Sequence, residues 1–220
     1  MAHVLSVNRS RPTAVPYTDA KGGVTGIAKR PVDGPVGVFA PGPRGQAGSG
    51  VDGDAVCDWR FHGGSEQAVY AYAREDLDGW ERELGRELAP GTFGENLTTV
   101  GIDVNSALVG ERWRIGAEVV LEVTSGRIPC RVFAGWLDEK GWVKRFTRAA
   151  LPGPFFRVLT AGQIAAGDPI TVLERPDHEV TVAFLFRAMT TEPELLERAL
   201  AARDALNATY AEAIRSRLGR

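Results

Sequence analysis

Glycine and proline divide this chain into short segments along most of its length. The 220 residues include 26 glycines and 13 prolines, and the apolar stretches between them are brief. Such segments suit β-strands, which need only about five residues, better than helices, which average about three turns. Many short strands joined by frequent turns predict a closed or strongly curved β architecture with few helices.

Several segments have the composition of strands. Residues 108–115 and 119–124 flank Gly116-Ala117, which is typical of a hairpin. Residues 68–72 place two tyrosines on one face of a strand. The remaining predicted strands are 4–7, 155–159 and 170–174, with shorter β-like pieces within 27–39.

Helical spacing is confined to a few regions. Apolar residues recur at helical spacing within 74–84, and Gly85 is a natural stop. A second helix is expected over 141–151. Near the C-terminus the sequence predicts three more helices, the first capped by Thr181, the second begun by the capping box 191–194 and the third capped by Asn207.

The overall composition fits one full domain with a small appendage, which we expect over residues 1–176 and 177–220. The appendage is too short to be stable alone, so its helices should dock on the β body, on a second copy in a homodimer or on a partner.

A net charge of −2 provides no basic field to attract nucleic acid. No stretch has the length of a membrane span or the apolar run of a signal peptide, so we expect no membrane partner. Two cysteines far apart favour a reducing, cytoplasmic compartment.

Cys130 is the first candidate for chemistry. It ends the segment Thr124-Ser125-Gly126-Arg127-Ile128-Pro129-Cys130, in which a predicted strand leads to a glycine, an arginine and a thiol that follows proline. Arg127 can stabilise a thiolate and pair with an anion. This pattern would present a soft thiolate to a metal or an electrophile beside a phosphate. The alternative is a buried cysteine that acts only as a small hydrophobe.

His62-Gly63-Gly64 is the second candidate. Paired glycines expose backbone N–H groups and permit the tight turns that hold anions. His62 could donate a hydrogen bond to a phosphate or act as a proton donor. The glycine-rich segment 40–53 is expected to be a mobile loop, and its glycines could also lie over a ligand. The alternative is a simple turn.

The segment Phe93-Gly94-Glu95-Asn96-Leu97 is the third candidate. Asn96 could read the edge of a heterocycle as donor and acceptor, and Glu95 could orient a neighbour. The alternative for Asn96 is a backbone-bonded turn. For Lys29 the residues alone favour a solvated or salt-bridged role, and Cys57 is interpreted as an incidental thiol.

Several familiar sites lack their motifs. No Cys-x-x-Cys pair and no HExxH motif is present, which argues against an ordinary zinc site. No Walker A loop and no GxGxxG follows a predicted strand, so nucleotide binding by those routes is unsupported. A thiol-hydrolase triad of Cys130 with His62 and either Asn96 or Glu95 stays open, because sequence does not show which groups meet.

The order and spacing of these motifs are more specific than any one of them. They comprise residues 4–8, 27–32, 61–64, 68–72, 93–97, 127–130, 157–159 and 167–170, followed by forty residues of helical character. Together they resemble the MOSC family, the C-terminal domain type of molybdenum cofactor sulfurases, in its stand-alone YiiM-like branch. Ser125-Gly126 departs from the Gln-Pro often found there, which bears on the substrate more than on the cofactor.

The resemblance implies a β-barrel-like fold with a pyranopterin molybdenum cofactor in a cleft. It implies that Cys130 is the thiolate ligand of molybdenum and that the remaining pocket residues are Lys29, His62, Gly63, Gly64, Asn96 and Arg127, whose cationic and N–H groups would meet the cofactor phosphate. Members of the family reduce small N-hydroxylated molecules such as hydroxylaminopurines and amidoximes to amines, with electrons from a separate flavin or iron–sulfur protein. Pyridoxal phosphate binding is a further property implied at the level of the family.

Two other functions remain open at this point. The protein could store or carry the cofactor or its sulfur without turnover. It could also be a metal-free thiol hydrolase that uses Cys130 and His62.

Overall fold

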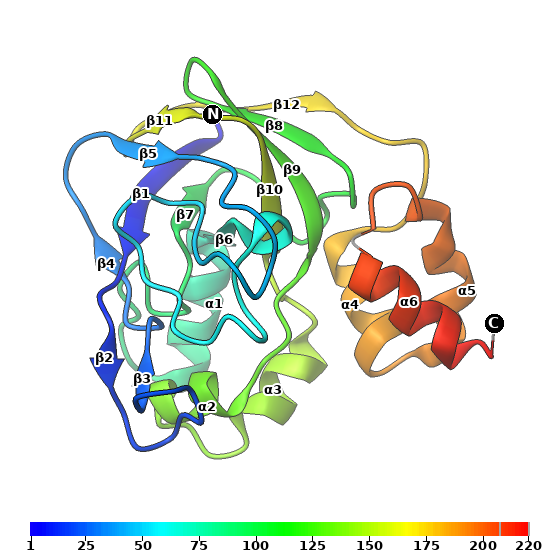
Figure 1. The fold of residues 1–220 in the computed structure, drawn as a ribbon, viewed down its shortest axis with the longest axis horizontal. Coiled ribbons are helices and arrows are strands. Elements are labelled where there is room, and N and C mark those ends of the chain that lie inside the picture. The colour runs from blue at the N-terminus through cyan, green and yellow to red at the C-terminus, as the bar shows by residue number, and fades with distance from the viewer. Residues whose placement is uncertain (207, 220) are drawn as a thin grey trace.

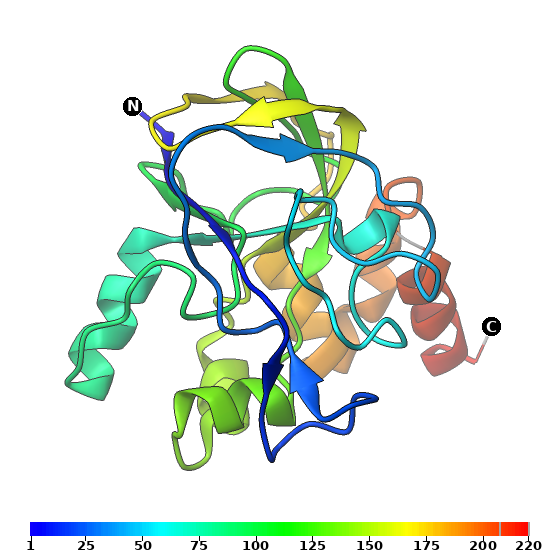
Figure 2. The same ribbon diagram turned by 60° about the vertical axis from the view of Figure 1, so that its left-hand side comes forward.

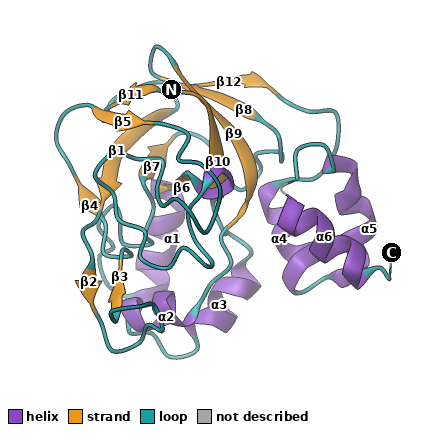
Figure 3. Ribbon diagram, in the orientation of Figure 1, coloured by secondary structure: helices purple, strands orange, loops and turns teal. Residues whose placement is uncertain are grey.

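The computed structural model describes residues 1–206 and 208–219, and its architecture is dominated by one sheet with a helical C-terminal part (Figure 1 and Figure 3). The main sheet has the strand order β12-β8-β9-β10-β6-β7-β1-β4. Its strands are β1 (His3–Arg9), β4 (Arg30–Pro31), β6 (Val69–Ala73), β7 (Leu97–Val100), β8 (Arg112–Ile115), β9 (Val119–Gly126), β10 (Pro154–Thr160) and β12 (Ile170–Glu174). Two small sheets pair β2 (Thr13–Ala14) with β3 (Val24–Thr25) and β5 (Val36–Val38) with β11 (Gly162–Ile164). The expectation of a mainly β fold with α is confirmed.

The main sheet is strongly curved but not closed. Its neighbouring strands run antiparallel except β6 and β7, which are parallel and connected through α1 (Arg74–Leu84). The start of β1 meets the segment before β12, where His3 bridges Pro169 and the Val4 N–H donates to the Asp168 carbonyl at 2.9 Å. Among the described residues this contact is an isolated bridge and not a ladder, so the sheet is barrel-like without full closure.

The β8–β9 hairpin forms where it was predicted, around Gly116-Ala117. Its register places Trp113 opposite Leu121, and both side chains are buried inside the curved sheet. The Trp113 ring packs against Phe156 of β10 with ring centroids 5.1 Å apart. Burial of a side chain such as Leu121 or Phe156 contributes about 1.5–3 kcal/mol. This core therefore fixes the strand β9, which leads to the candidate thiol.

A second core consists of aromatic side chains beneath α1, α2 (Arg131–Leu137) and α3 (Trp142–Ala149). The helix predicted over 74–84 is confirmed, and Gly85 ends it in the left-handed conformation with φ 66°. The second predicted helix is α3. Helix α2 was not predicted, because seven residues carry little helical pattern and its stability comes from packing. Phe133 of α2 is fully buried and lies 5.0 Å from Phe93 between ring centroids.

The C-terminal part begins as predicted with α4 (Val182–Thr190), whose cap Thr181 accepts a hydrogen bond from the Phe184 N–H. The predicted second helix is instead a chain of short pieces, two 3-10 turns (Pro193–Leu195 and Leu200–Ala202) around α5 (Leu196–Ala199). The predicted capping box is wrong, because the cap is Glu192 and its side chain makes no capping bond. The last helix is α6 (Ala208–Arg217), and the predicted cap Asn207 lies outside the described residues.

The C-terminal helices pack against the β body. Their apolar core includes Val109 from the body, and the Val109 N–H donates to the Val180 carbonyl at 3.0 Å. Arg44 Nη2 donates to Thr209 Oγ1 of α6 at 2.9 Å, so α6 lies beside the glycine-rich loop, as Figure 2 also shows. None of the helices in the described part of the chain is both long and apolar enough to cross a bilayer.

Candidate functional site

Two adjoining cavities open where the loops after β2, β3, β5 and β9 meet. The inner cavity has a volume of about 120 Å³ and the outer cavity about 410 Å³. His62, Arg127 and Cys130 line both, so the two cavities form one site. The residues predicted from sequence that line the inner cavity are Lys29, His62, Gly63, Asn96, Arg127 and Cys130. Gly64 lines neither cavity.

Cys130 lies at the junction of the two cavities, four residues beyond the end of β9. Pro129 precedes it, and Cys130 itself is the cap residue of α2. Its thiol is free and partly buried. The strand, the proline and the helix together hold the sulfur at a fixed place on the wall that a ligand would meet.

Arg127 is a cation without an acidic partner. Its guanidinium lies over the Phe133 ring at 4.5 Å and over the Tyr70 ring at 5.2 Å from the centroids. Its Nε is buried and has no hydrogen-bond partner, and among the described residues no carboxylate lies within ion-pair distance. The two rings fix the planar group in place, and its N–H donors remain available to an anion in either cavity.

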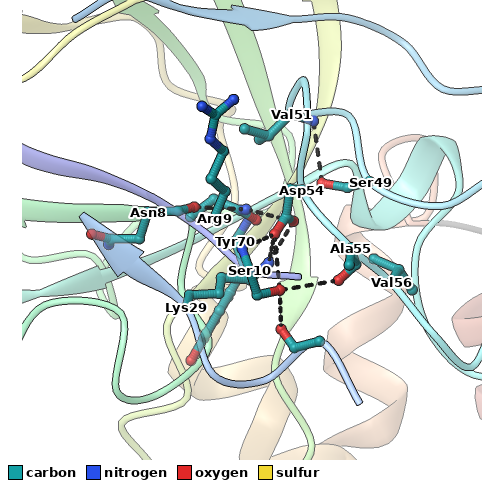
Figure 4. Close-up of polar contacts among 12 residues, drawn as sticks. Asn8, Arg9, Ser10, Lys29, Ser49, Val51, Asp54, Ala55, Val56 and Tyr70 are labelled. Atoms are coloured by element: carbon teal, nitrogen blue, oxygen red, sulfur yellow. Dashed lines mark hydrogen bonds and ion pairs between the residues drawn. The ribbon is translucent and has the colours of Figure 1, made fainter. Parts of the chain in front are cut away.

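Lys29 does not offer a free cation, because it is paired with Asp54. The Asp54 carboxylate accepts from the Lys29 ammonium and from the Ser10 N–H at 2.9 Å (Figure 4). It also accepts from Asn96 Nδ2 at 2.9 Å. Burial lowers the pKa of Lys29, and the Asp54 charge opposes that shift. Asp54 was not predicted as a site residue, because no sequence pattern near it indicates its partners. The network joins four distant segments into one wall of the inner cavity.

The side chain of Asn96 also makes its hydrogen bonds within the protein. Its Oδ1 accepts from the Tyr70 N–H at 3.2 Å, and its Nδ2 donates to the Asn8 carbonyl at 3.3 Å as well as to Asp54. Glu95 is fully buried and accepts hydrogen bonds from the Phe93 N–H and the Thr98 hydroxyl. Neither side chain is therefore placed to orient a histidine, and the thiol-hydrolase triad does not form with them.

His62 stands between the two cavities as a neutral imidazole. Burial lowers its pKa to about 4, and the positive charges of Arg127 and Arg44 add to the shift, while Asp58 opposes it. At neutral pH the ring can therefore accept or donate a hydrogen bond, but it does not hold a second proton. A bound anion would raise the pKa of His62 by offsetting the two arginines.

The glycines after His62 allow close contacts between backbone segments, rather than contact with a ligand. A Cβ on Gly63 would lie 2.6 Å from the Gly48 carbonyl oxygen, and one on Gly64 would fall on the backbone of Arg44. The Gly64 N–H donates to that Gly48 carbonyl at 2.9 Å. The expectation that the Gly64 N–H meets a phosphate is thus wrong, because the group is already bonded. The glycines allow the loop that carries Arg44 to lie across this turn.

Three further residues line the site and were not assigned from sequence. Cys57 is partly buried in the inner cavity, and burial raises the pKa of its thiol. Arg44 and Tyr210 line the outer cavity. Tyr210 belongs to α6, and Arg44 bonds to Thr209 of the same helix, so both depend on contacts between distant segments for which short-range sequence patterns gave no signal.

The match of the chain to known proteins decides its family. A family model for the MOSC domain matches residues 58–171. The chain belongs to the MOSC domain family. The matched segment contains His62, Arg127 and Cys130 but begins after Lys29 and Asp54, so part of the inner wall comes from the chain that precedes the match.

Relatives of this MOSC protein extend over most of its length. The uncharacterized protein YflK of Bacillus subtilis is 33% identical over 184 residues, which make up 84% of this chain and 79% of YflK. A protein of Gibberella moniliformis named a reductase is 34% identical over 155 residues, but these are only 26% of that protein. The crystal structure of YiiM from Geobacillus stearothermophilus has a TM-score of 0.79 at 25% identity and covers 99% of this chain. The resemblance to a stand-alone YiiM-like MOSC protein is confirmed.

The MOSC site fits a metal that brings most of its own ligands. Within the described residues no three His, Cys, Asp or Glu side chains gather as a metal site would require. Cys130 can supply one soft ligand, and Arg127 can supply charge to an attached phosphate. A pyranopterin that carries molybdenum through its own sulfur atoms agrees with this donor set.

Proposed function

We propose that this MOSC protein binds a molybdenum pyranopterin cofactor and reduces N-hydroxylated compounds to amines. The observation that carries the proposal is that one thiol, Cys130, and one guanidinium, Arg127, which has no acidic partner among the described residues, line both cavities. A soft thiolate and an anion receptor in the same site suit a cofactor that carries both a soft metal and a phosphate. The reductase name of the Gibberella relative agrees with this reaction class.

In this proposal Cys130 holds the metal and Arg127 holds the phosphate. When bound, the cofactor supplies a metal centre that exchanges electron pairs and accepts oxygen. Cys57 is the weaker candidate ligand, because burial raises its pKa and keeps the thiol protonated at neutral pH. The ion pair of Lys29 and Asp54 acts as a rigid wall and not as a phosphate clamp.

The reaction R–NHOH + 2e⁻ + 2H⁺ → R–NH₂ + H₂O needs protons at the substrate nitrogen and oxygen. His62 is a histidine that lines both cavities, so we assign this task to it. With a pKa of about 4 it does not store a proton at pH 7. A cofactor anion at Arg127 would raise that pKa and would let His62 pass a proton from solvent to the substrate.

The electrons would come from another protein. The chain has two cysteines, fewer than the four ligands that an iron–sulfur cluster takes. A flavin or iron–sulfur reductase would therefore supply them, and both thiols suit a reducing cytoplasm. The alternative function is a carrier of the cofactor or its sulfur, which would bind the same group without turnover.

The deciding experiment is metal analysis of the full-length protein expressed with molybdate in a host that makes the cofactor. We expect near-stoichiometric molybdenum in the wild type and in Cys57→Ala, and its loss in Cys130→Ala. Cys57→Ala is the matched control, because both thiols line the inner cavity. Molybdenum retained by Cys130→Ala would refute the ligand assignment. A loaded wild type that fails to reduce hydroxylamines or amidoximes with several electron donors would favour the carrier.

A further inference from the structure

The outer cavity carries positive charge that its own acids do not balance. Its charged lining residues are Asp19, Arg44, Asp58, Arg60, Arg127 and Arg131. Arg60 pairs with Asp58 at 2.8 Å, and Arg131 pairs with Asp19 at 2.8 Å. Four arginines less two paired aspartates leave a local charge of +2, in a protein whose formal net charge is −2. A cavity with this local excess concentrates anions.

The two unbalanced arginines occupy different places. Arg127 lines both cavities beside Cys130, whereas Arg44 lines the outer cavity alone. An anion on the cofactor is accounted for by Arg127. Arg44 does not line the inner cavity, and its charge has no role in the proposed function.

Arg44 is held in place by the C-terminal helices. Its backbone lies against Gly64, and its Nη2 donates to Thr209 Oγ1 of α6 at 2.9 Å. A guanidinium has five N–H donors, so most of them stay available in that position. Within the described part of the chain no carboxylate lies within ion-pair distance of it. The helices thus position a cation at the rim of the outer cavity.

Apolar and aromatic side chains also line the outer cavity. Phe61 is 63% exposed and Ile128 is 43% exposed, and both line the outer cavity with Tyr210. Large exposed apolar side chains around a cavity mark a surface that a ligand covers. The Arg60 guanidinium lies over the Phe61 ring at 5.3 Å from its centroid, and the other face of an aromatic ring of this kind can stack on a flat heterocycle. The outer cavity therefore combines a surface for a planar ring with a cation for an anionic group.

We infer that the outer cavity binds a nucleoside monophosphate, with its phosphoryl group on Arg44 and its base against Phe61 and Tyr210. Guanidinium groups bind phosphate through paired, charge-assisted hydrogen bonds. The inference deepens the proposed function and rests on it in one respect, since it names a nucleotide as the form in which the N-hydroxylated substrate is bound. The cofactor carries a phosphoryl group of the same chemistry, and the experiment separates the two sources.

The test is calorimetric titration of full-length protein, cofactor-loaded and cofactor-free, with adenosine 5′-monophosphate and with adenosine. We expect the monophosphate to bind about ten- to hundredfold more tightly than the nucleoside in both forms, the range of one or two charged hydrogen bonds. Arg44→Ala and Arg44→Gln should remove this preference, and Thr209→Val should reduce it. Arg203→Ala is the matched control, since this C-terminal arginine is 72% exposed and lines neither cavity. In the loaded enzyme, Arg44→Ala should raise KM for an N-hydroxylated nucleotide more than it raises KM for the corresponding free base.

Two results would overturn the inference. One is equal affinity for the monophosphate and the nucleoside in wild type, or a preference that survives both Arg44 variants. The other is monophosphate binding to cofactor-free protein alone together with molybdenum loss from Arg44→Ala, which would assign the phosphoryl site to the cofactor. Calorimetry needs no turnover. A protein that binds the monophosphate through Arg44 but reduces no N-hydroxylated compound would refute the reductase proposal and leave the nucleotide site standing.

Discussion

Lys29 and Asp54 form an ion pair that is almost completely removed from solvent, with side chains 7% and 1% exposed. The pair lies on the wall of the inner cavity, and Asp54 also accepts a hydrogen bond from Ser10 (Figure 4) and another from Asn96. Buried ion pairs gain little net stability, but removal of one partner leaves an uncompensated charge. The pair therefore connects the fold of the loops to the shape of the site.

Loss of one partner of this pair should destabilise the protein strongly. We expect Asp54→Ala or Lys29→Met to lower the free energy of unfolding by about 3–5 kcal/mol, because a charge stays buried without its partner. Urea unfolding of the cofactor-free protein measures this effect. The control is Glu179→Ala in the exposed pair with Arg198, whose side chains are 55% and 54% exposed. That change should lower the free energy of unfolding by less than about 1 kcal/mol. Equal effects at the two pairs would contradict the role assigned to Asp54.

Arg127 should be needed for the ligand and not for the fold. No acid among the described residues pairs with it, so Arg127→Met should lower the free energy of unfolding of the cofactor-free protein by less than about 1 kcal/mol, a loss limited to the contacts with the two rings. The same variant should lose at least about tenfold in cofactor affinity, the worth of one charged hydrogen bond. Molybdenum content after dialysis and urea unfolding give the two readouts.

Arg112→Met provides the comparison for that variant. Arg112 bonds to Glu122 and Glu174, each at 2.8 Å, and it lies outside both cavities. Its replacement should lower stability modestly and leave molybdenum content unchanged. A loss of stability at Arg127 without a loss of molybdenum would reverse the assignment.

His62 should titrate near pH 4 in the cofactor-free protein. Its folded pKa of about 4 lies below the ordinary value of 6.5, so between these pH values the unfolded chain binds more protons. The contribution of His62 to stability is therefore complete above pH 6.5 and is lost as the pH falls to about 4. His62→Gln should flatten the pH dependence of unfolding in this window. Proton NMR of the imidazole measures the pKa directly.

The charges around His62 supply internal controls for the titration. Arg127→Met should raise the pKa of His62 more than Arg44→Ala does, and Asp58→Asn should lower it, in keeping with their charges and order of effect. A pKa of 6.5 in wild type would show that the ring is solvated and would contradict its burial between the two cavities.

The sequence predicted the parts of the fold that depend on neighbouring residues. Gly85 and Thr181 mark a helix end and a helix start in the chain itself, and both were found. Helix α2 was missed, because Phe133 is held by tertiary packing and not by helical propensity. The predicted box at 191–194 failed because Pro193 begins a 3-10 turn after a cap that makes no side-chain bond.

In the candidate site, too, the sequence indicated the residues that stand in short motifs and not those that depend on distant contacts. Cys130, Arg127 and His62 each stand in a short motif of glycine or proline, and the sequence indicated them. Asp54 could not be found, because its partners at positions 10, 29 and 96 meet it only in the folded chain. Arg44 likewise depends on the docking of α6.

Gly64 gives a test of the backbone that carries Arg44. Gly64 has φ 77°, and a Cβ at this position would meet the Arg44 backbone, whereas Gly34 has φ 76° with nothing within 4 Å of its Cβ position. Replacement of either by alanine incurs the cost of a left-handed residue, about 1–2 kcal/mol. Measured by urea unfolding, Gly64→Ala should lower the free energy of unfolding by at least about 2 kcal/mol more than Gly34→Ala does, because the backbone must shift to relieve the overlap. It should also weaken binding of adenosine 5′-monophosphate, since Arg44 moves, while Gly34→Ala leaves that affinity unchanged. Equal losses of unfolding free energy in the two variants would mean that the loop at Arg44 shifts without penalty. Arg44 would then not be held in a fixed position in the outer cavity.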